Sequence, residues 1–290
     1  MVTALITTIN LAAVYALVAV GISLTWSGLG FLNLGHGMTF AVSGYAAWWV
    51  AGHLSSSPPA VLGAGLLAGA AVGALICVTT FLPLEGRPNF EMRSLIATLA
   101  LSLIGGNLLL DVFGPDLKAV PAIFGTRMFR IGDAVVTPDK YGAVISAVVV
   151  LSLLLVTLKW SKLGLSVRAL TQNAEGAQLV GINRSVMAIA ILAVSGSLAG
   201  LAAVLLSQTF FVGPTSGVLP LVTGLIVALL GGLGSLGGTI VASVLIAGAE
   251  GFTEVYIGGQ YGLMMQFALI AAVLLVRPRG LGGILETVRA

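Results

Sequence analysis

The chain has 290 residues, of which 58% are hydrophobic, only 8% are charged and 39 are glycine. Soluble domains carry roughly 25% charged residues and under half apolar ones, so this composition excludes an ordinary water-soluble domain. Since a membrane-spanning helix needs about 20 apolar residues, the chain can supply roughly 8 to 10 spans and little else. The net charge of +3 comes without a dense basic cluster, which gives no reason to expect nucleic acid as a partner.

Nine apolar runs divide the chain. Because backbone groups in lipid must bond to one another, we interpret the runs as helices and expect an all-α polytopic bundle in one transmembrane domain, residues 1–290. The run at 218–231 is short and is typical of a half-span or a re-entrant segment. The N-terminus lacks the basic region and cleavage site of a signal peptide, so the first run is expected to stay as a span. We predict eight full spans, give or take one, at about 3–26, 31–51, 60–82, 95–113, 141–158, 186–208, 239–256 and 262–276.

The positive residues predict the orientation of the chain. With the N-terminus outside, alternate crossings place the connections 83–94 and 159–185 and the C-terminal tail on one side. That side should be the cytoplasm, because Lys and Arg resist translocation. In the connection 111–140 four aspartates balance the remaining four positive residues. The predicted cytoplasmic side holds nine of the thirteen Lys and Arg residues: Arg87, Arg93, Lys159, Lys162, Arg168, Arg184, Arg277, Arg279 and Arg289.

Two glycine-rich stretches suggest an internal repeat. Residues 28–37 and residues 231–238 each follow an apolar run and precede another one. Transporters are often built from repeats whose helices are interrupted by glycine at matching positions. Chance similarity between glycine-rich stretches is an equal alternative.

Catalytic chemistry finds little support in the sequence. The two histidines, His36 and His53, have no Cys or carboxylate at a ligand spacing, so we expect no zinc site. The lone Cys77 lies in an apolar run, where it serves as filler. The stretch 231–238 lacks the Gly-Lys-Ser/Thr ending of a nucleotide-binding loop. We expect no catalytic residue, metal or cofactor, so any ATP-driven work requires another polypeptide.

Polar residues inside the spans are the candidates for a solute path, since burying them in lipid is costly. Asn33 and His36 flank a glycine-rich break, and a helix cap with an interhelical hydrogen bond is an equal alternative for them. Glu250 and Glu254 share a helix face, for which a solvated outer rim is favoured. Gln208 and Gln266 belong to the same half of the chain. No span has Lys or Arg in its interior, and this favours a neutral or zwitterionic solute.

The connection 159–185 is the most informative segment because it is semi-apolar and has helix punctuation. Asn173 can cap a short helix and Glu175 lies in its first turn, where the helix dipole favours a negative charge. Gly181 can end this helix in the left-handed conformation, and Asn183 can cap the next span. A short amphipathic helix of this kind suits a groove on a partner protein, with lipid headgroups as the alternative contact.

At these residues the sequence resembles the integral membrane permeases of branched-chain amino acid ABC importers, the LivH type. Residues 164–182 follow the family pattern G-x-x-x-R-A-x-x-x-N-x-x-x-A-x-x-x-G-I. Within it, residues 175–181 resemble the Glu-Ala-Ala-x-x-x-Gly signature, with Gly176 in place of the first alanine. The family's Asn-x-x-His-Gly stands at 33–37, its G-G-x-G-S-x-x-G at 231–238 and its R-P-x-G-L at 277–281. These motifs occur in family order over almost the whole chain.

The resemblance implies a permease that forms half of a pore in a bacterial inner membrane. A second related permease, two cytoplasmic ABC ATPases and an extracytoplasmic solute-binding protein would complete the importer, with lipid around it. The coupling to the ATPase would rest on Arg168, Ala169, Asn173, Glu175, Gly176, Ala177 and Gly181. The candidate solute path would comprise Asn33, His36, Gly37, Gly231, Gly232 and Ser235. A urea or short-chain amide permease of the same type, a passive small-solute channel and a structural scaffold are the alternatives.

Overall fold

The structure is a computed structural model that describes residues 1–125, 128–131 and 134–282, and within this part of the chain it is almost entirely helical. The predicted all-α bundle is confirmed. The long helices are α1 (Val2–Leu29), α2 (His36–His53), α3 (Pro58–Ile76), α5 (Phe90–Phe113), α6 (Pro138–Trp160), α9 (Arg184–Ser207), α10 (Val218–Gly231), α11 (Leu236–Tyr256) and α12 (Gly262–Val276). The shorter ones are a π-helical turn (Cys77–Phe81), α4 (Leu82–Leu84), α7 (Lys162–Gln172), α8 (Ala174–Leu179) and a 3₁₀ turn (Gly259–Tyr261).

The number of full spans lies within the prediction of eight, give or take one, and one predicted span is shorter than expected. Seven helices of the described chain are long and apolar enough to cross a membrane, rather than eight. The predicted span at 31–51 is not among these seven helices. Residues 31–35 form a non-helical break, so α2 begins only at His36, and it ends at a second histidine, His53. The short helix expected at 218–231 is present with those bounds as α10. The π-helical turn, with α4 behind it, continues α3, so that Pro58–Leu84 counts as one span.

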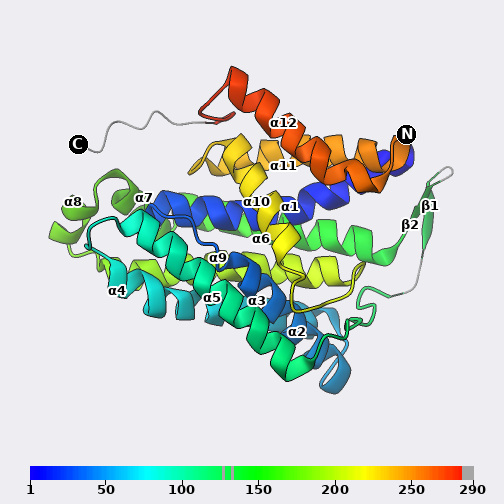
Figure 1. Cartoon of the computed structure of the whole chain (residues 1–290), viewed down its shortest axis with the longest axis horizontal. Helices are drawn as coiled ribbons and strands as arrows, with labels where there is room; N and C mark the ends of the chain where they lie inside the picture. Colours follow the sequence, from blue (N-terminus) through cyan, green and yellow to red (C-terminus); the bar gives the residue numbers. More distant parts are fainter. Residues whose placement is uncertain (126–127, 132–133, 283–290) are drawn as a thin grey trace.

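A small antiparallel hairpin, absent from the prediction, lies in the connection between α5 and α6. Its strands are β1 (Phe129–Ile131) and β2 (Ala134–Val136), with Arg130 opposite Val135. Figure 1 shows the hairpin and the N-terminus at one end of the molecule and α7 and α8 at the other. We call these the hairpin end and the α8 end.

The positive residues are divided unequally between the two ends. Eight of the eleven described Lys and Arg residues belong to or adjoin helix ends at the α8 end, while Lys118, Arg130 and Lys140 belong to or adjoin the connection that carries the hairpin. Figure 1 shows these two groups of elements at opposite ends. Arg127, Asp133 and Arg289, which entered the charge prediction, lie outside the described residues.

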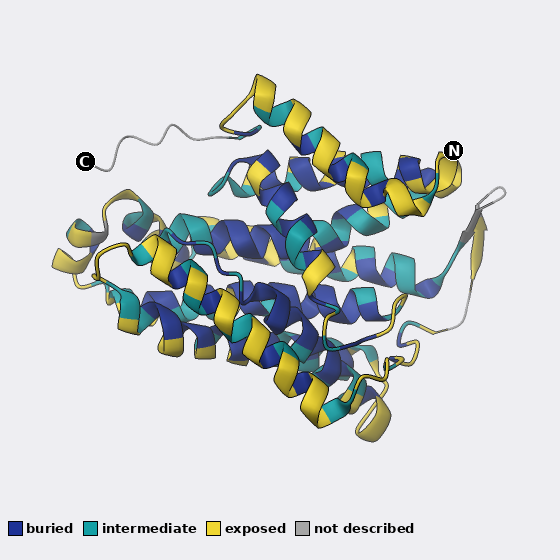
Figure 2. Cartoon of the chain, in the orientation of Figure 1, coloured by how far each residue is buried: buried dark blue, intermediate teal, exposed yellow. Residues whose placement is uncertain are grey.

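Helices α1 and α9 form the centre of the bundle. Both are mostly buried, whereas α5 and α12 expose most of their residues on the outside, as Figure 2 shows. Helix α9 packs closely against α3 through glycines spaced one turn apart. A Cβ added at Gly69 would collide with the carbonyl oxygen of Gly196, and one at Gly65 would press on Gly200. Small residues at such crossings let two backbones approach each other, which is the usual basis of helix association in membranes.

The helix packing has an inverted internal symmetry. The contact between α1 and α11 corresponds to the contact between α9 and α3. In the same way, the contacts of α2 with α3, α5 and α9 correspond to those of α10 with α11, α12 and α1. Helix α1 runs toward the α8 end while α9 runs away from it (Figure 1). Each is followed by a non-helical stretch, at 30–35 and at 208–217, and then by the shorter helix α2 or α10. The structure thus pairs the break at 30–35 with 208–217, and not with 231–238 as the glycine pattern suggested.

The two short helices begin next to each other. Gly37, in the first turn of α2, lies against the backbone of Gly217, the residue before α10, so closely that no Cβ would fit at Gly217. Non-helical backbone at membrane depth is tolerated only where protein surrounds it. The break meets this condition, because Phe31 is fully buried and Leu34 donates its N–H to Thr98 of α5 at 3.1 Å.

Candidate functional site

The predicted coupling segment consists of two short helices whose ends are fixed by side-chain caps. Ser161 accepts a hydrogen bond from the N–H of Gly164 at the start of α7, and Asn173 accepts one from Gly176 at the start of α8, at 2.8 Å. Gly181 has the left-handed conformation, with φ of 87°. Asn183 caps α9 by accepting from Val186 at 3.2 Å. The caps expected at Asn173 and Asn183 and the left-handed Gly181 are therefore confirmed as local structure.

The segment is attached firmly to the transmembrane bundle. The guanidinium of Arg168 donates to the carbonyl oxygens of Leu158 (2.7 Å) and Lys159 (3.2 Å), in the last turn of α6. This contact satisfies carbonyl groups that the end of a helix leaves unpaired. Ala177 is buried in a hydrophobic cluster with Val167 and Leu170 of α7, into which Ala169 also packs. A displacement of α7 and α8 would therefore be transmitted to α6.

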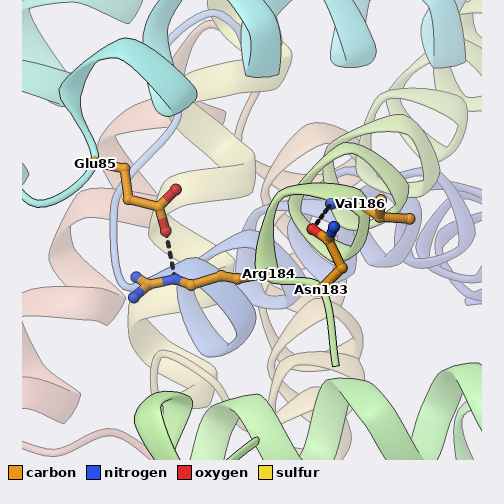
Figure 3. Close-up of polar contacts among 4 residues, drawn as sticks. All are labelled: Glu85, Asn183, Arg184 and Val186. Carbon is orange, nitrogen blue, oxygen red and sulfur yellow. Dashed lines mark hydrogen bonds and ion pairs between the residues drawn. The ribbon is translucent and has the colours of Figure 1, made fainter. Parts of the chain in front are cut away.

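An ion pair joins the start of α9 to the connection before α5. Figure 3 shows Arg184 reaching Glu85, with 2.5 Å between Nε and Oε1, beside the Asn183 cap. Both side chains are partly exposed, so the pair contributes at most about 1 kcal/mol to stability. Its effect is to tie the coupling segment to the α3–α5 turn.

The outer surface of the segment is open and mixed in character. Glu175 and Gln178 are exposed, and Leu179 and Val180 have 89% and 77% of their surface accessible. Figure 2 shows mostly exposed and half-buried backbone at the tip of the α8 end. Two adjacent apolar side chains beside a carboxylate, on a capped helix that projects from the bundle, form a suitable contact for a protein partner.

The predicted solute-path residues near the break are buried. Asn33 accepts a hydrogen bond from the N–H of Gly35 at 3.0 Å, which holds the turn before α2. His36 packs against Gly21 of α1, is 1% exposed, and neither of its ring nitrogens has a hydrogen-bond partner among the described residues. Gly37 forms the contact with Gly217 described above. In this structure these residues are packed in the interior of the bundle, and their part in a solute path stays a prediction.

The other predicted path residues form the turn between α10 and α11 at the α8 end. Ser235 caps α11 by accepting from Gly238 at 3.1 Å, and Gly232 has φ of 88°. The carbonyl of Gly231 accepts from the N–H of Gly282 at 2.9 Å, so the chain after α12 folds back onto this turn. The geometry gives Ser235 and Gly231 structural contacts, while their part in a solute path stays a prediction.

The structure contains a cavity of about 540 Å³, which is lined by residues other than those predicted for the solute path. Helix α1 contributes the middle of its length to the wall, and α2, α9, α10, α11 and α12 complete it, so the cavity lies between the centre of the bundle and the hairpin end. None of the six predicted path residues lines it. The lining is mainly apolar, and its polar side chains are Tyr15, Ser207, Ser216, Thr223, Glu250, Glu254 and Gln266.

A hydrogen-bond network connects four helices across this cavity. Oε2 of Glu250 on α11 accepts from the hydroxyl of Tyr15 on α1 at 2.6 Å and from Nε2 of Gln266 on α12 at 2.7 Å. The hydroxyl of Thr223 on α10 donates to Oε1 of Gln266 at 3.1 Å. The sequence identified Glu250 and Gln266 as intramembrane polar residues but favoured an outer rim for the glutamate. The partnership with Tyr15, 235 residues away, leaves no signal in a local pattern.

Comparison with known proteins agrees with these features. The family described as "Branched-chain amino acid transport system / permease component" matches residues 4–274, which include both the coupling segment and the cavity. The high-affinity branched-chain amino acid transport system permease protein LivH of Salmonella typhimurium is 27% identical over 95% of this chain and 93% of its own length.

Two further relatives have the same identity. These are the permease protein BraD of Pseudomonas aeruginosa, over 96% of this chain and 94% of its own, and a probable LivH of Methanocaldococcus jannaschii, over 92% and 88%. No solved structure shows significant similarity to the chain. The full-length match, the apolar helices and the order of the motifs agree: the chain is a multi-pass membrane protein and belongs to the permease family of branched-chain amino acid transport systems.

Proposed function

We propose that the chain is the permease subunit of an ATP-driven importer of branched-chain amino acids. The observation that carries the proposal is the capped α7–α8 segment inside a family match that spans residues 4–274. A passive channel for urea or another neutral solute would need no such projecting segment. The relatives compared above are all named as branched-chain amino acid permeases, and none favours the urea, amide or channel alternatives.

In this proposal α8 inserts into a groove on a cytoplasmic ABC ATPase. Leu179 and Val180 supply the apolar contact, and Glu175 and Gly176 form the first turn that faces the partner. Closure of two ATPases on ATP moves α8, and the hold of Arg168 on the end of α6 transmits the motion to the bundle. ATP must bind the two states of the importer with different affinity, since equal affinity would shift nothing.

The proposed assembly contains a second related permease, two ATPases and an extracytoplasmic solute-binding protein. The poorly buried helices α5 and α12 are available for the other permease and for lipid. The excess of Lys and Arg at the α8 end supports a cytoplasmic location for that end and for the C-terminus, with the N-terminus outside. The solute-binding protein then meets the hairpin end.

The solute route of this proposal begins at the cavity. It continues through the junction of Gly37 and Gly217, past Asn33 and His36, toward the turn at Gly231, Gly232 and Ser235. Successive residues of α1 lie beside this route. Tyr15 lines the cavity, Gly21 contacts His36, and the hydroxyl of Ser23 accepts a hydrogen bond from the N–H of Gly234. The junction is closed here, so passage requires the two short helices to separate.

The test is leucine uptake by cells that lack their own branched-chain importers and express the chain with its partner subunits. The variant Glu175→Lys reverses a charge on the proposed contact and should abolish uptake and ATPase coupling while the protein still inserts. Glu91→Lys makes the same change at an exposed carboxylate at the start of α5 and is the matched control. Unaided leucine flux by a chain that never associates with an ATPase would contradict the proposal.

A further inference from the structure

The cavity contains a carboxylate without a positive partner. Glu250 is half-buried on the cavity wall, and no Lys, Arg or His lines the cavity among the described residues. A negative charge in a water-poor site is costly unless a cation or several donors compensate it. The two donors that Glu250 has, the Tyr15 hydroxyl and the Gln266 amide, are both neutral.

The geometry leaves half of this carboxylate free. Both donors bind Oε2, and the described residues give Oε1 no hydrogen bond. Thr223 fixes the amide of Gln266 from the other side, so that its nitrogen points to Glu250. The carboxylate is thus oriented by three helices while one of its oxygens remains available. An ionised carboxylate can accept about four hydrogen bonds, so there is room for a further donor.

The neighbouring glutamate is different. Glu254 also lines the cavity, one turn further along α11, but it is exposed and no described residue donates a hydrogen bond to it. It therefore fits the solvated rim that the sequence favoured for both residues. Glu250, held by Tyr15 and Gln266, does not fit a rim.

Most of the cavity wall is apolar. Leu11 and Val14 of α1, Phe40 of α2, Leu219 and Pro220 of α10 and Leu263 of α12 surround the polar network. A volume of about 540 Å³ lies within the range of roughly 300–1,000 Å³ that small-molecule sites occupy. An aliphatic group can therefore be buried beside the carboxylate, where removal from water favours its binding.

We propose that the cavity is a binding site for a primary ammonium group on a branched aliphatic skeleton, with Glu250 as the residue that binds the ammonium. A primary ammonium has three N–H donors and the charge that Glu250 lacks. The assignment rests on the import function proposed above, because a branched-chain amino acid presents this combination of groups. Tyr15 and Gln266 are positioning residues: they hold Oε2 and direct Oε1 toward the bound amine.

The test uses two probes that share one branched tail. Isoamylamine has the ammonium, and 4-methylpentanoate has a carboxylate in its place. The full chain with Ser216→Cys, in lipid nanodiscs, reacts with methyl methanethiosulfonate at the cavity wall, and the single native thiol, Cys77, is fully buried. Saturating isoamylamine should slow the modification by about tenfold or more, the scale of one charge-assisted hydrogen bond, while 4-methylpentanoate at the same concentration changes it little.

In the background of Glu250→Gln, protection by isoamylamine should fall to the level of the acid. Glu250→Asp should keep part of it, and Glu91→Gln should keep all of it. An unchanged rate of modification without probe shows that each variant is folded. Equal protection by both probes, no protection by either, or protection that survives Glu250→Gln would overturn the site. A chain that passes this test yet imports no leucine would refute the import function alone.

Discussion

The coupling segment and the cavity are built in opposite ways. The segment takes its shape from residues close in sequence. Ser161, Asn173 and Asn183 each accept a hydrogen bond from the N–H three residues further along the chain, and the left-handed Gly181 follows the end of α8. The cavity takes its shape from residues far apart in sequence, such as Tyr15 and Glu250, on six helices that pack together. A local motif can thus specify a contact surface, whereas a binding cavity requires the packing of the whole bundle.

The largest effect is expected where the bundle itself is changed. Gly69→Leu would force a side chain into the backbone of Gly196, which cannot move without displacing α9. We expect a cost of more than about 3 kcal/mol and loss of the cavity together with the coupling surface. Gly63→Leu is the matched control on the same helix, because nothing lies within 4 Å of its added Cβ.

The measurement is the amount of folded protein recovered in mild detergent and its thermal unfolding midpoint. Gly63→Leu should resemble the native chain in both. A Gly69→Leu variant that folds and takes up leucine normally would mean that the α3–α9 crossing is not what holds the cavity in shape.

This contrast also explains what the sequence could predict. The apolar runs gave the helices, and the cap residues gave the ends of α8 and the start of α9, since these signals lie within a few residues of each other. The sequence indicated a break beside Asn33 and His36, but the second span was still predicted to begin at residue 31, because apolar Phe31, Leu32 and Leu34 continue the hydrophobic run. Only the burial of this stretch by α5 and the π-helical turn makes non-helical backbone acceptable there.

The internal repeat could not be assigned correctly for the same reason. Both glycine-rich stretches lie between helices, and each contains a glycine with a positive φ, Gly30 or Gly232, and one close to another backbone, Gly37 or Gly238. The likeness therefore reflects local backbone requirements and not the symmetry of the fold. The true partner of the break, 208–217, has no comparable run of glycines. Symmetry of packing direction is a property of the fold that a single sequence does not display.

A second prediction separates coupling from folding. Gly181→Pro is incompatible with a φ of 87° and removes the N–H that Gly181 donates to Gln178. We expect leucine uptake to fall by at least about tenfold, while insertion and thermal stability stay close to native, because Gly181 and the preceding Leu179 and Val180 are exposed.

Gly181→Asn provides the comparison, since asparagine tolerates the left-handed region better than other residues with a side chain. It should keep most of the uptake. Equal loss in both variants would show that the position needs the absence of a side chain rather than the left-handed backbone, and would indicate a tight contact with the ATPase.

The smallest effect tests how far local structure alone determines the coupling surface. Asn173→Ala removes the acceptor for the N–H of Gly176 and should cost about 1 kcal/mol of local helix stability. Since α8 has only six residues and leucine uptake depends on its docked form, the amide protons of α8 should exchange about fivefold faster, with a modest decrease in uptake. Asn173→Asp keeps an acceptor and adds a charge that the helix N-terminus favours, so it should exchange no faster than the native chain. If Asn173→Ala leaves exchange unchanged, then the buried Ala177 and its cluster, rather than the cap, hold α8 in shape, and the coupling surface depends on tertiary packing just as the cavity does.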